Sequence, residues 1–275
     1  MPAIQPARLR QQAVLLSQHF DQPAAFVRNL QYIFEFYAER IRRHGLKGSP
    51  AAMLPAYQVP QPVLRYLLQE LAPLVEGEPA AGLALCDGLW EQDMLEYHQL
   101  ACLLLGSIPV SDSSQVLERI RSWVESQPEN ILLDAIFKNG LVYLRSHFPQ
   151  DVLDLAESWL IGSQPLDKQL GLRVLSSVIQ DPGFENLPVL FRMIHPLCQV
   201  IPAAVRPDVL DLLEVLARRS PQETAHFLRQ TLNLPDSPQT PWLVRQVLHA
   251  FPEDIQKSLR LTLRSLEAVP PTVNG

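Results

Sequence analysis

The sequence predicts an all-α protein, a right-handed solenoid of two-helix repeats. Apolar residues recur at helical spacing in one segment after another from residue 62 onward, and no stretch shows the period of two that a strand requires. The 25 prolines outnumber the 11 glycines and fall between these segments, where they end one helix and begin the next. The later helices also begin at an interval in the thirties, which is typical of two-helix solenoid repeats.

The chain is expected to form a single helical-repeat domain over residues 1–275. N-terminal helices at 6–19 and 23–44 come first, and the second has a basic last turn before Gly45 that favours a helix end. Residues 45–61 are rich in proline and lack a period, which indicates a loop. The repeats follow over 62–267, and 268–275 form a disordered tail. The expected repeat helices are 62–75, 79–91, 93–106, 112–125, 128–147, 150–161, 165–180, 187–200, 204–219, 221–232, 240–250 and 253–267.

Three of these repeats share letters as well as spacing. Pro149, Pro221 and Pro252 are each followed by Gln or Glu, then by Asp or Glu, and eleven residues after the proline by Leu. A proline in the first turn loses no hydrogen bond, and an acid beside it meets the positive end of the helix dipole. Each cluster therefore predicts the start of a first helix.

Composition and charge narrow the functional classes. The net charge is −6, which disfavours a strong nonspecific nucleic-acid binder. The acid is concentrated, however: residues 51–135 hold three Lys/Arg against twelve Asp/Glu, whereas 1–50 hold seven against three and 136–275 hold thirteen against fourteen. The whole-chain charge therefore does not exclude DNA.

Cysteine usage and hydropathy indicate the compartment. Cys86, Cys102 and Cys198 lie on apolar helix faces without CxxC spacing, which argues against disulfides and zinc and suits a reducing cytoplasm. The N-terminus lacks the apolar core of a signal peptide, and the apolar runs are too short to cross a membrane. We therefore expect a cytoplasmic protein, a monomer, with no membrane partner.

The usual catalytic signatures do not occur. The sequence has no phosphate loop, dinucleotide fingerprint, HExxH or GxSxG motif, so we expect no cofactor and no metal. His98 and Cys102 lie one helical turn apart and could serve as base and nucleophile, but we favour a histidine at a wet edge beside a core cysteine. Glu91, Asp93 and Glu96 could form acid/base machinery, but we favour a solvated corner and first turn of a helix.

Asp134 and a set of basic residues are the stronger functional candidates. Asp134 lies in mid-helix among apolar residues, where a carboxylate is unfavourable unless it is hydrogen-bonded or functional; a solvent-facing position is the alternative. Basic residues favour the second helices of the repeats, which usually line the concave side of such solenoids. The candidates for a cationic groove are Lys138, Arg145, Lys168, Arg173, Arg206, Arg218, Arg219 and Arg245. Six acids share these helices, so the predicted field is modest.

Several groups of letters point to one family. They are Leu89–Trp90, Glu96–Ala101 followed by LLLG, and, less specifically, Leu117–Trp123, Ser158–Leu160 and Gln169–Arg173. With these letters, residues 62–232 resemble the alkylpurine DNA glycosylases built from HEAT-like repeats, also called the DNA alkylation repair family. The resemblance implies a solenoid of HEAT-like helical hairpins with a concave DNA-binding groove.

The resemblance also implies a site. In active members an aspartate, neighbouring tryptophans and an arginine line the groove and stabilise the cationic sugar as the base departs. The aspartate falls on Asp134, but residues 128–133 contain no tryptophan, the arginine position falls at Lys168 or Gln169, and the later tryptophan falls near Asp211. One acid therefore remains of a group that needs several members, and the resemblance predicts DNA binding more strongly than base excision.

The sequence thus favours a DNA-binding, DNA-repair-type protein that grips alkylated duplex DNA in a concave groove. Asp134 is its catalytic candidate, and if the chain is active it hydrolyses alkylated purine nucleotides as an N-glycosylase. The alternative is a noncatalytic scaffold that binds a protein in the same groove, which the acidic block at 51–135 supports. The proposed DNA contacts are Lys138, Arg145, Lys168, Arg173, Arg218, Arg219 and Arg245.

Overall fold

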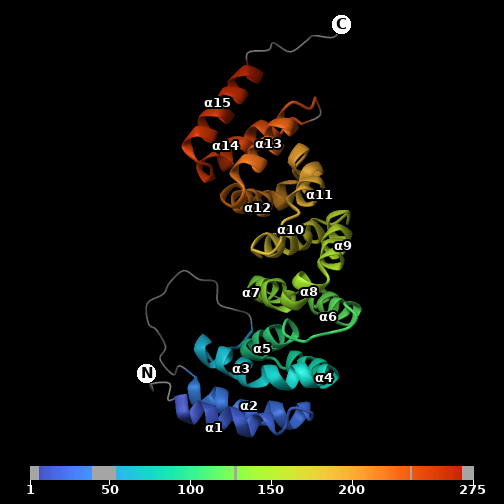
Figure 1. The fold of residues 1–275 in the computed structure, drawn as a ribbon, viewed down its shortest axis with the longest axis vertical. Coiled ribbons are helices and arrows are strands. Elements are labelled where there is room, and N and C mark those ends of the chain that lie inside the picture. The colour runs from blue at the N-terminus through green and yellow to red at the C-terminus, as the bar shows by residue number, and fades with distance from the viewer. Residues whose placement is uncertain (1–5, 39–53, 127–128, 236, 268–275) are drawn as a thin grey trace. The chain divides into compact units, whose positions relative to one another are not determined.

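The structure, a computed structural model, describes residues 6–38, 54–126, 129–235 and 237–267. Within these residues every regular element is helical (Figure 1). The first helices are α1 (Pro6–Ser17), α2 (Pro23–Tyr37), α3 (Gln61–Gly77), α4 (Pro79–Trp90), α5 (Leu95–Leu105), α6 (Ser114–Glu125), α7 (Asn130–Ala135) and α8 (Val142–His147). They are followed by α9 (Pro149–Leu160), α10 (Pro165–Ile179), α11 (Leu187–Gln199), α12 (Arg206–Arg219), α13 (Pro221–Leu232), α14 (Thr240–Val247) and α15 (Glu253–Glu267).

The all-α prediction is confirmed for the described residues. Most predicted helices begin and end within two residues of those observed, because prolines in the first turn mark many of the starts. The helix predicted at 128–147 is instead three segments, with a π-helix at Ile136–Gly140 between α7 and α8. The basic turn before Gly45, most of the 45–61 loop and the 268–275 tail lie outside the described residues.

The chain divides into two compact units, Met1–Asp151 and Val152–Gly275. In the first, Phe26, Phe34 and Phe137 are among the largest fully buried side chains. In the second, fully buried residues such as Leu175 and Leu213 form a separate core. The expectation of one domain over 1–275 stays a prediction, as do the handedness and the groove of a solenoid.

A buried glutamate organises the first unit. Glu96 is 3% exposed, and its carboxylate accepts hydrogen bonds from the backbone N–H groups of Tyr57 (3.0 Å), Gln58 (2.6 Å) and Val59 (3.2 Å). Gln58 has a φ of 61°, a left-handed conformation that points its N–H toward the carboxylate together with its neighbours. The interpretation of Glu96 as a solvated helix start is therefore wrong: its charge is used to fold a loop about forty residues upstream.

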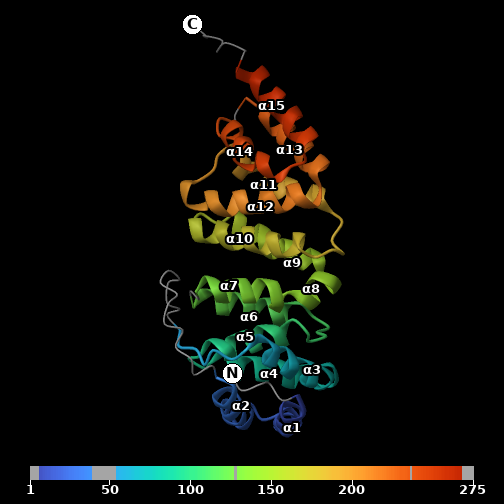
Figure 2. The same ribbon diagram turned by 90° about the vertical axis from the view of Figure 1, so that its left-hand side faces the viewer.

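The second unit is built from two layers of helices. α10, α12 and α14 pack in succession in one layer, and α11, α13 and α15 pack in succession in the other. Figure 2 shows α10 and α12 side by side. Gly171 lets α9 and α10 approach closely, since a Cβ at this position would lie 2.7 Å from Leu160 Cγ and 2.9 Å from the Ala156 carbonyl oxygen. Among the described residues, no helix is both long and apolar enough to cross a membrane.

Candidate nucleic-acid interface

Asp134 lies on the exposed face of α7. Ile131, Asp134 and Lys138 are all exposed and follow one another at helical spacing, while Leu132 and Phe137 are buried. The apolar residues on both sides of Asp134 in sequence thus point inward and the carboxylate points outward. The solvent-facing alternative is the one observed, and a ligand can reach this carboxylate.

The π-helix that begins two residues after Asp134 packs closely against the end of α5. A Cβ on Gly106 would overlap the carbonyl oxygen of Asn139, so only glycine fits there, and the N–H of Tyr143 donates to the Gly106 carbonyl at 3.0 Å. Single π-turns often occur at functional sites because they widen the backbone locally. Gly106 is the glycine of the LLLG letters, which gives that motif a structural reason.

Arg145 supports this same turn. Its guanidinium donates from Nη1 to the Phe137 carbonyl (2.9 Å) and from Nη2 to the Lys138 carbonyl (3.1 Å). These carbonyls belong to the π-helix, whose altered hydrogen bonding leaves acceptors for a side chain. Arg145 therefore positions the segment that carries Asp134 and Lys138.

Two other predicted DNA contacts also hold helix ends. Lys168 donates from Nζ to the carbonyls of Leu160, at 3.2 Å, and Gly162, after the end of α9. Arg219 donates to the carbonyl of Ile179, the last residue of α10, and to those of Asp181 (2.8 Å for Nη1) and Phe184 beyond it. Both side chains satisfy backbone acceptors that a helix end leaves without intrahelical partners.

The remaining candidates lie nearer the surface of the second unit. Nε of Arg173 is 3.9 Å from Asp208 Oδ1, and Arg218 donates from Nη2 to Glu214 at 2.6 Å. Burial raises the pKa of Asp208, and the Arg173 guanidinium opposes this shift. Arg218 and Arg245 are exposed, as is Lys138 in the first unit. The cations of α10, α12 and α14 are thus interleaved with carboxylates, as their sequence predicted.

This layer also contains a tryptophan that is not among the predicted site residues, Trp242. Trp242 of α14 is 37% exposed, and the Arg206 guanidinium carbon lies 5.4 Å from its ring centre. The helical periodicity of α14 is the signal that could have identified it. Leu243, Val244 and Val247 form the buried face of this helix, and Trp242 lies outside that face.

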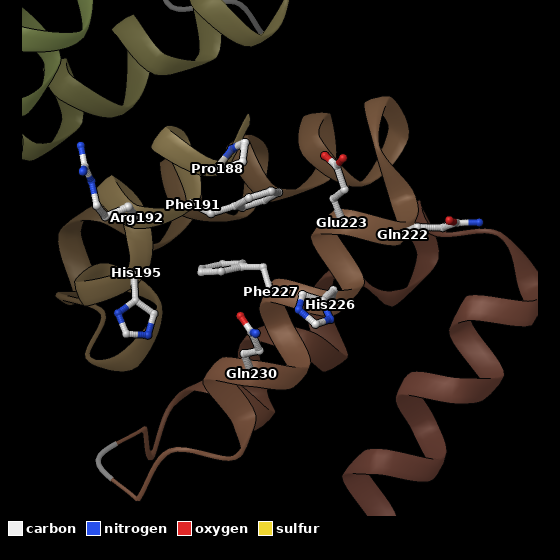
Figure 3. A pocket seen from close by; sticks show the side chains of 9 residues that line it. All are labelled: Pro188, Phe191, Arg192, His195, Gln222, Glu223, His226, Phe227 and Gln230. Atoms are coloured by element: carbon white, nitrogen blue, oxygen red, sulfur yellow. The ribbon is translucent and has the colours of Figure 1, made fainter. Parts of the chain in front are cut away.

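The other layer of this unit carries an apolar cleft. It lies between α11 and α13 and has a volume of about 590 Å³ (Figure 3). The rings of Phe191 and Phe227 stack across it with centres 4.9 Å apart, and His195 and Gln230 lie beside them. A cleft of this composition suits an apolar ligand or a protein segment better than phosphates.

The His98 and Cys102 pair has a structural role. His98 is 8% exposed, stacks on Trp90 at 4.3 Å, and places Nε2 2.8 Å from the Trp90 carbonyl oxygen. Trp90 stacks in turn on Trp123 at 4.1 Å. Burial lowers the pKa of His98 and raises that of Cys102 far above its ordinary value, so neither group is prepared as an ion or a nucleophile. His98 is therefore buried rather than at a wet edge.

The cysteines of the chain are not exposed to solvent. Cys86, Cys102 and Cys198 are buried free thiols. Within the same residues, no three His, Cys, Asp or Glu side chains gather as metal ligands would.

The comparison with protein families decides the assignment. The family model of the DNA alkylation repair enzymes matches residues 35–250. The chain belongs to this family. The match covers α3 to α14 and therefore includes Asp134, the π-helix and both layers of the second unit. No curated protein and no solved structure matches the chain. Membership in the family points to a role in DNA repair, with DNA as the substrate class.

Proposed function

We propose that this member of the DNA alkylation repair family binds duplex DNA through the exposed cations of its helical surfaces. The match over residues 35–250 is the observation that carries the proposal. In the second unit, the exposed or half-buried cations of the α10–α12–α14 layer supply the contacts; they are Arg173, Arg206, Arg218 and Arg245. Lys138 supplies one in the first unit. Right-handed HEAT-like repeats with a concave groove are part of the proposal.

The proposed contacts differ from the sequence-based set for a physical reason. Arg145, Lys168 and Arg219 donate to backbone carbonyls, so a phosphate would have to compete with these hydrogen bonds. Asp208, Asp211 and Glu214 share the layer with the arginines and reduce its positive field. Binding should therefore be weak and strongly dependent on salt, because phosphate contacts act by releasing counterions.

Titration of a fluorescent duplex against salt tests the proposal. We expect anisotropy to rise at low salt, and Arg218→Glu and Arg245→Glu each to weaken binding and reduce the salt slope by about one. Arg260→Glu on α15 is the matched control, since it makes the same change in charge on a surface outside the layer. Absence of binding by the wild type at low salt would refute DNA binding.

We further propose that Asp134 is the group positioned for chemistry. Its exposed carboxylate, two residues before the π-helix, can stabilise the positive charge that a sugar develops when an alkylated purine leaves. The proposed reaction is hydrolysis of the N-glycosidic bond. Chromatography should measure the release of methylated purine from duplex DNA treated with a methylating agent. We expect Asp134→Asn to lose this activity and Asp154→Asn on α9 to retain it. DNA binding without base release by the wild type would leave a non-enzymatic DNA protein.

The cleft between α11 and α13 favours a second candidate, a protein-binding scaffold. Its stacked phenylalanines give an apolar surface of the kind that protein partners cover. The cleft lies in the opposite layer from Arg218 and Arg245, so this partner would not use the groove that the sequence suggested. A partner retained after nuclease treatment should be lost from Gln230→Glu and kept by Gln246→Glu, a matched change on α14. Equal retention by both variants would exclude the cleft.

A further inference from the structure

The helices α10, α12 and α14 run parallel within their layer, so their first residues share one edge. Gln169, in the second turn of α10, donates to Asp208 near the start of α12 at 3.3 Å. Arg219, the last residue of α12, donates to the carbonyl of Asp181 just beyond α10. The start of α10 therefore lies beside the start of α12, and the end of α10 beside the end of α12.

The same holds for α12 and α14. Arg206, the first residue of α12, lies over the ring of Trp242 in the first turn of α14. Farther along both helices, Glu214 in the third turn of α12 lies 3.2 Å from His249, just beyond α14. The edge formed by the helix starts therefore brings together a guanidinium and an indole. Leu166 adds an exposed apolar side chain at the start of α10.

The indole at this edge is accessible to a ligand. Trp242 is 37% exposed, more than any other tryptophan of the chain, since Trp123 is buried and Trp90 and Trp159 are only partly exposed. Its side chain departs from the buried stripe of α14 formed by Leu243, Val244 and Val247. The ring carries the guanidinium of Arg206, so an aromatic surface and a cation lie together at this edge.

The carboxylates near this edge are partly compensated by their own partners, which reduces their repulsion of an anion. Asp208 is 3.9 Å from Arg173 and accepts a hydrogen bond from Gln169, so part of its charge is compensated. Asp167, at the start of α10, accepts from the backbone N–H of Gln164 in a capping box. Arg206, two residues before Asp208 in the sequence, is exposed and can place its guanidinium on a phosphate oxygen.

From this geometry we propose that Arg206 and Trp242 form a binding site for an unpaired nucleotide of single-stranded DNA. Trp242 stacks on the base, and Arg206 binds the adjacent phosphate. Bases of an intact duplex are stacked on one another, so the indole distinguishes a single strand or an unpaired base from continuous duplex. The inference rests on the proposed DNA-binding function and adds a substrate preference to it.

Tryptophan fluorescence with a short oligothymidylate at low salt tests the site. The wild type should show saturable quenching, which Trp242→Leu should abolish. Anisotropy of a labelled oligothymidylate should show that this variant binds about tenfold or more weakly, as expected for the loss of one base stack. Trp159→Leu, which removes an indole from α9, should keep both. Arg206→Glu should weaken binding more than Arg260→Glu, the same change in charge on α15. Circular dichroism shows that each variant retains its helices.

Failure of the inference and failure of the proposed function give different results. If the oligothymidylate binds equally well to Trp242→Leu, or if only duplex binds, the inference is wrong and duplex binding stands. If neither nucleic acid binds the wild type at low salt, the proposed function fails and the inference fails with it. Loss of binding confined to Trp242→Leu and Arg206→Glu supports both.

Discussion

The two units of the chain differ in what they bury. The first buries Glu96, His98 and Ser113, whereas the buried polar side chains described in the second are hydroxyl groups of serine and threonine. Glu96 gathers three backbone N–H groups, and other acids of the first unit are also engaged: Glu129 accepts from the Leu54 N–H at 2.7 Å, and Asp87 binds Arg119 through both oxygens. These three acids of the block at 51–135 therefore serve folding.

In the second unit, Lys168 and Arg219 hold helix ends, but other charges remain at the surface. Arg218 pairs with Glu214 while 62% exposed, and Arg206 lies over an exposed tryptophan. A ligand can compete for such groups at little cost, because exposed ion pairs contribute little to stability. The difference shows that the number of charged residues in a segment does not locate a binding surface by itself. The charged side chains that hydrogen-bond within the fold must first be set aside.

The closest helix contacts of the two units give the largest expected effect. Gly106→Ala should lower the free energy of unfolding by about 3 kcal/mol or more, because the new Cβ meets the rigid backbone of Asn139. Gly171→Ala should cost about 1–2 kcal/mol, since part of its contact is with the side chain of Leu160, which can adjust. Gly77→Ala, with no atom within 4 Å, should not destabilise. Urea unfolding measures all three, and equal values would contradict the tighter contact at Gly106.

The next effect tests the buried charge directly. Glu96→Gln should lower the free energy of unfolding by about 2–3 kcal/mol, because a neutral amide cannot replace a carboxylate that accepts from three N–H groups. Glu91→Gln, on an exposed glutamate at the same corner, should change it by about 0.5 kcal/mol or less. A small effect at Glu96 would show that its hydrogen bonds are not what holds residues 57–59.

The sequence predicted the helices better than the roles of their side chains. Prolines and apolar periodicity are local signals, so the bounds of α9 and α13 could be predicted without tertiary information. The π-helix depends on the contact between Gly106 and Asn139, and the burial of Glu96 on a loop far upstream; neither partner is adjacent in sequence. Arg219 likewise gains its role from carbonyls about forty residues away.

The sequence identified several candidate site residues but did not predict their contacts. The family letters placed the aspartate on α7, and the structure shows it exposed. The basic bias of the second helices could be counted, but which cations cap helices and which reach solvent depends on how helix ends pack. Trp242 could have been found from its phase in α14; its pairing with Arg206 could not.

Two adjacent arginines of α12 test the second half of the comparison. Arg219→Gln should cost about 1–2 kcal/mol of stability, because carbonyls after α10 lose a charged donor. Arg218→Gln removes an exposed ion pair with Glu214, four residues away, and should cost about 0.5 kcal/mol or less. For each kcal/mol of stability lost, Arg218→Gln should weaken DNA binding more than Arg219→Gln does. Equal losses of stability would mean that the surface pair contributes to folding as the helix cap does.

The smallest expected effect is a pH dependence from His98. Burial lowers the pKa of this histidine below its ordinary value of 6.5, so the unfolded chain binds a proton more readily than the folded one. The stability from neutral His98 is present above pH 6.5 and is lost as the pH falls toward the lowered pKa of the folded chain. Unfolding in urea from neutral to mildly acidic pH should show this decline in the wild type and in His147→Gln, an exposed histidine, and a flatter profile in His98→Gln. The comparison uses slopes, because His98→Gln also disturbs the stack on Trp90 at every pH. If the slope of unfolding free energy against pH is unchanged in His98→Gln, other groups cause the decline, and the burial of His98 does not make the stability of the first unit depend on pH.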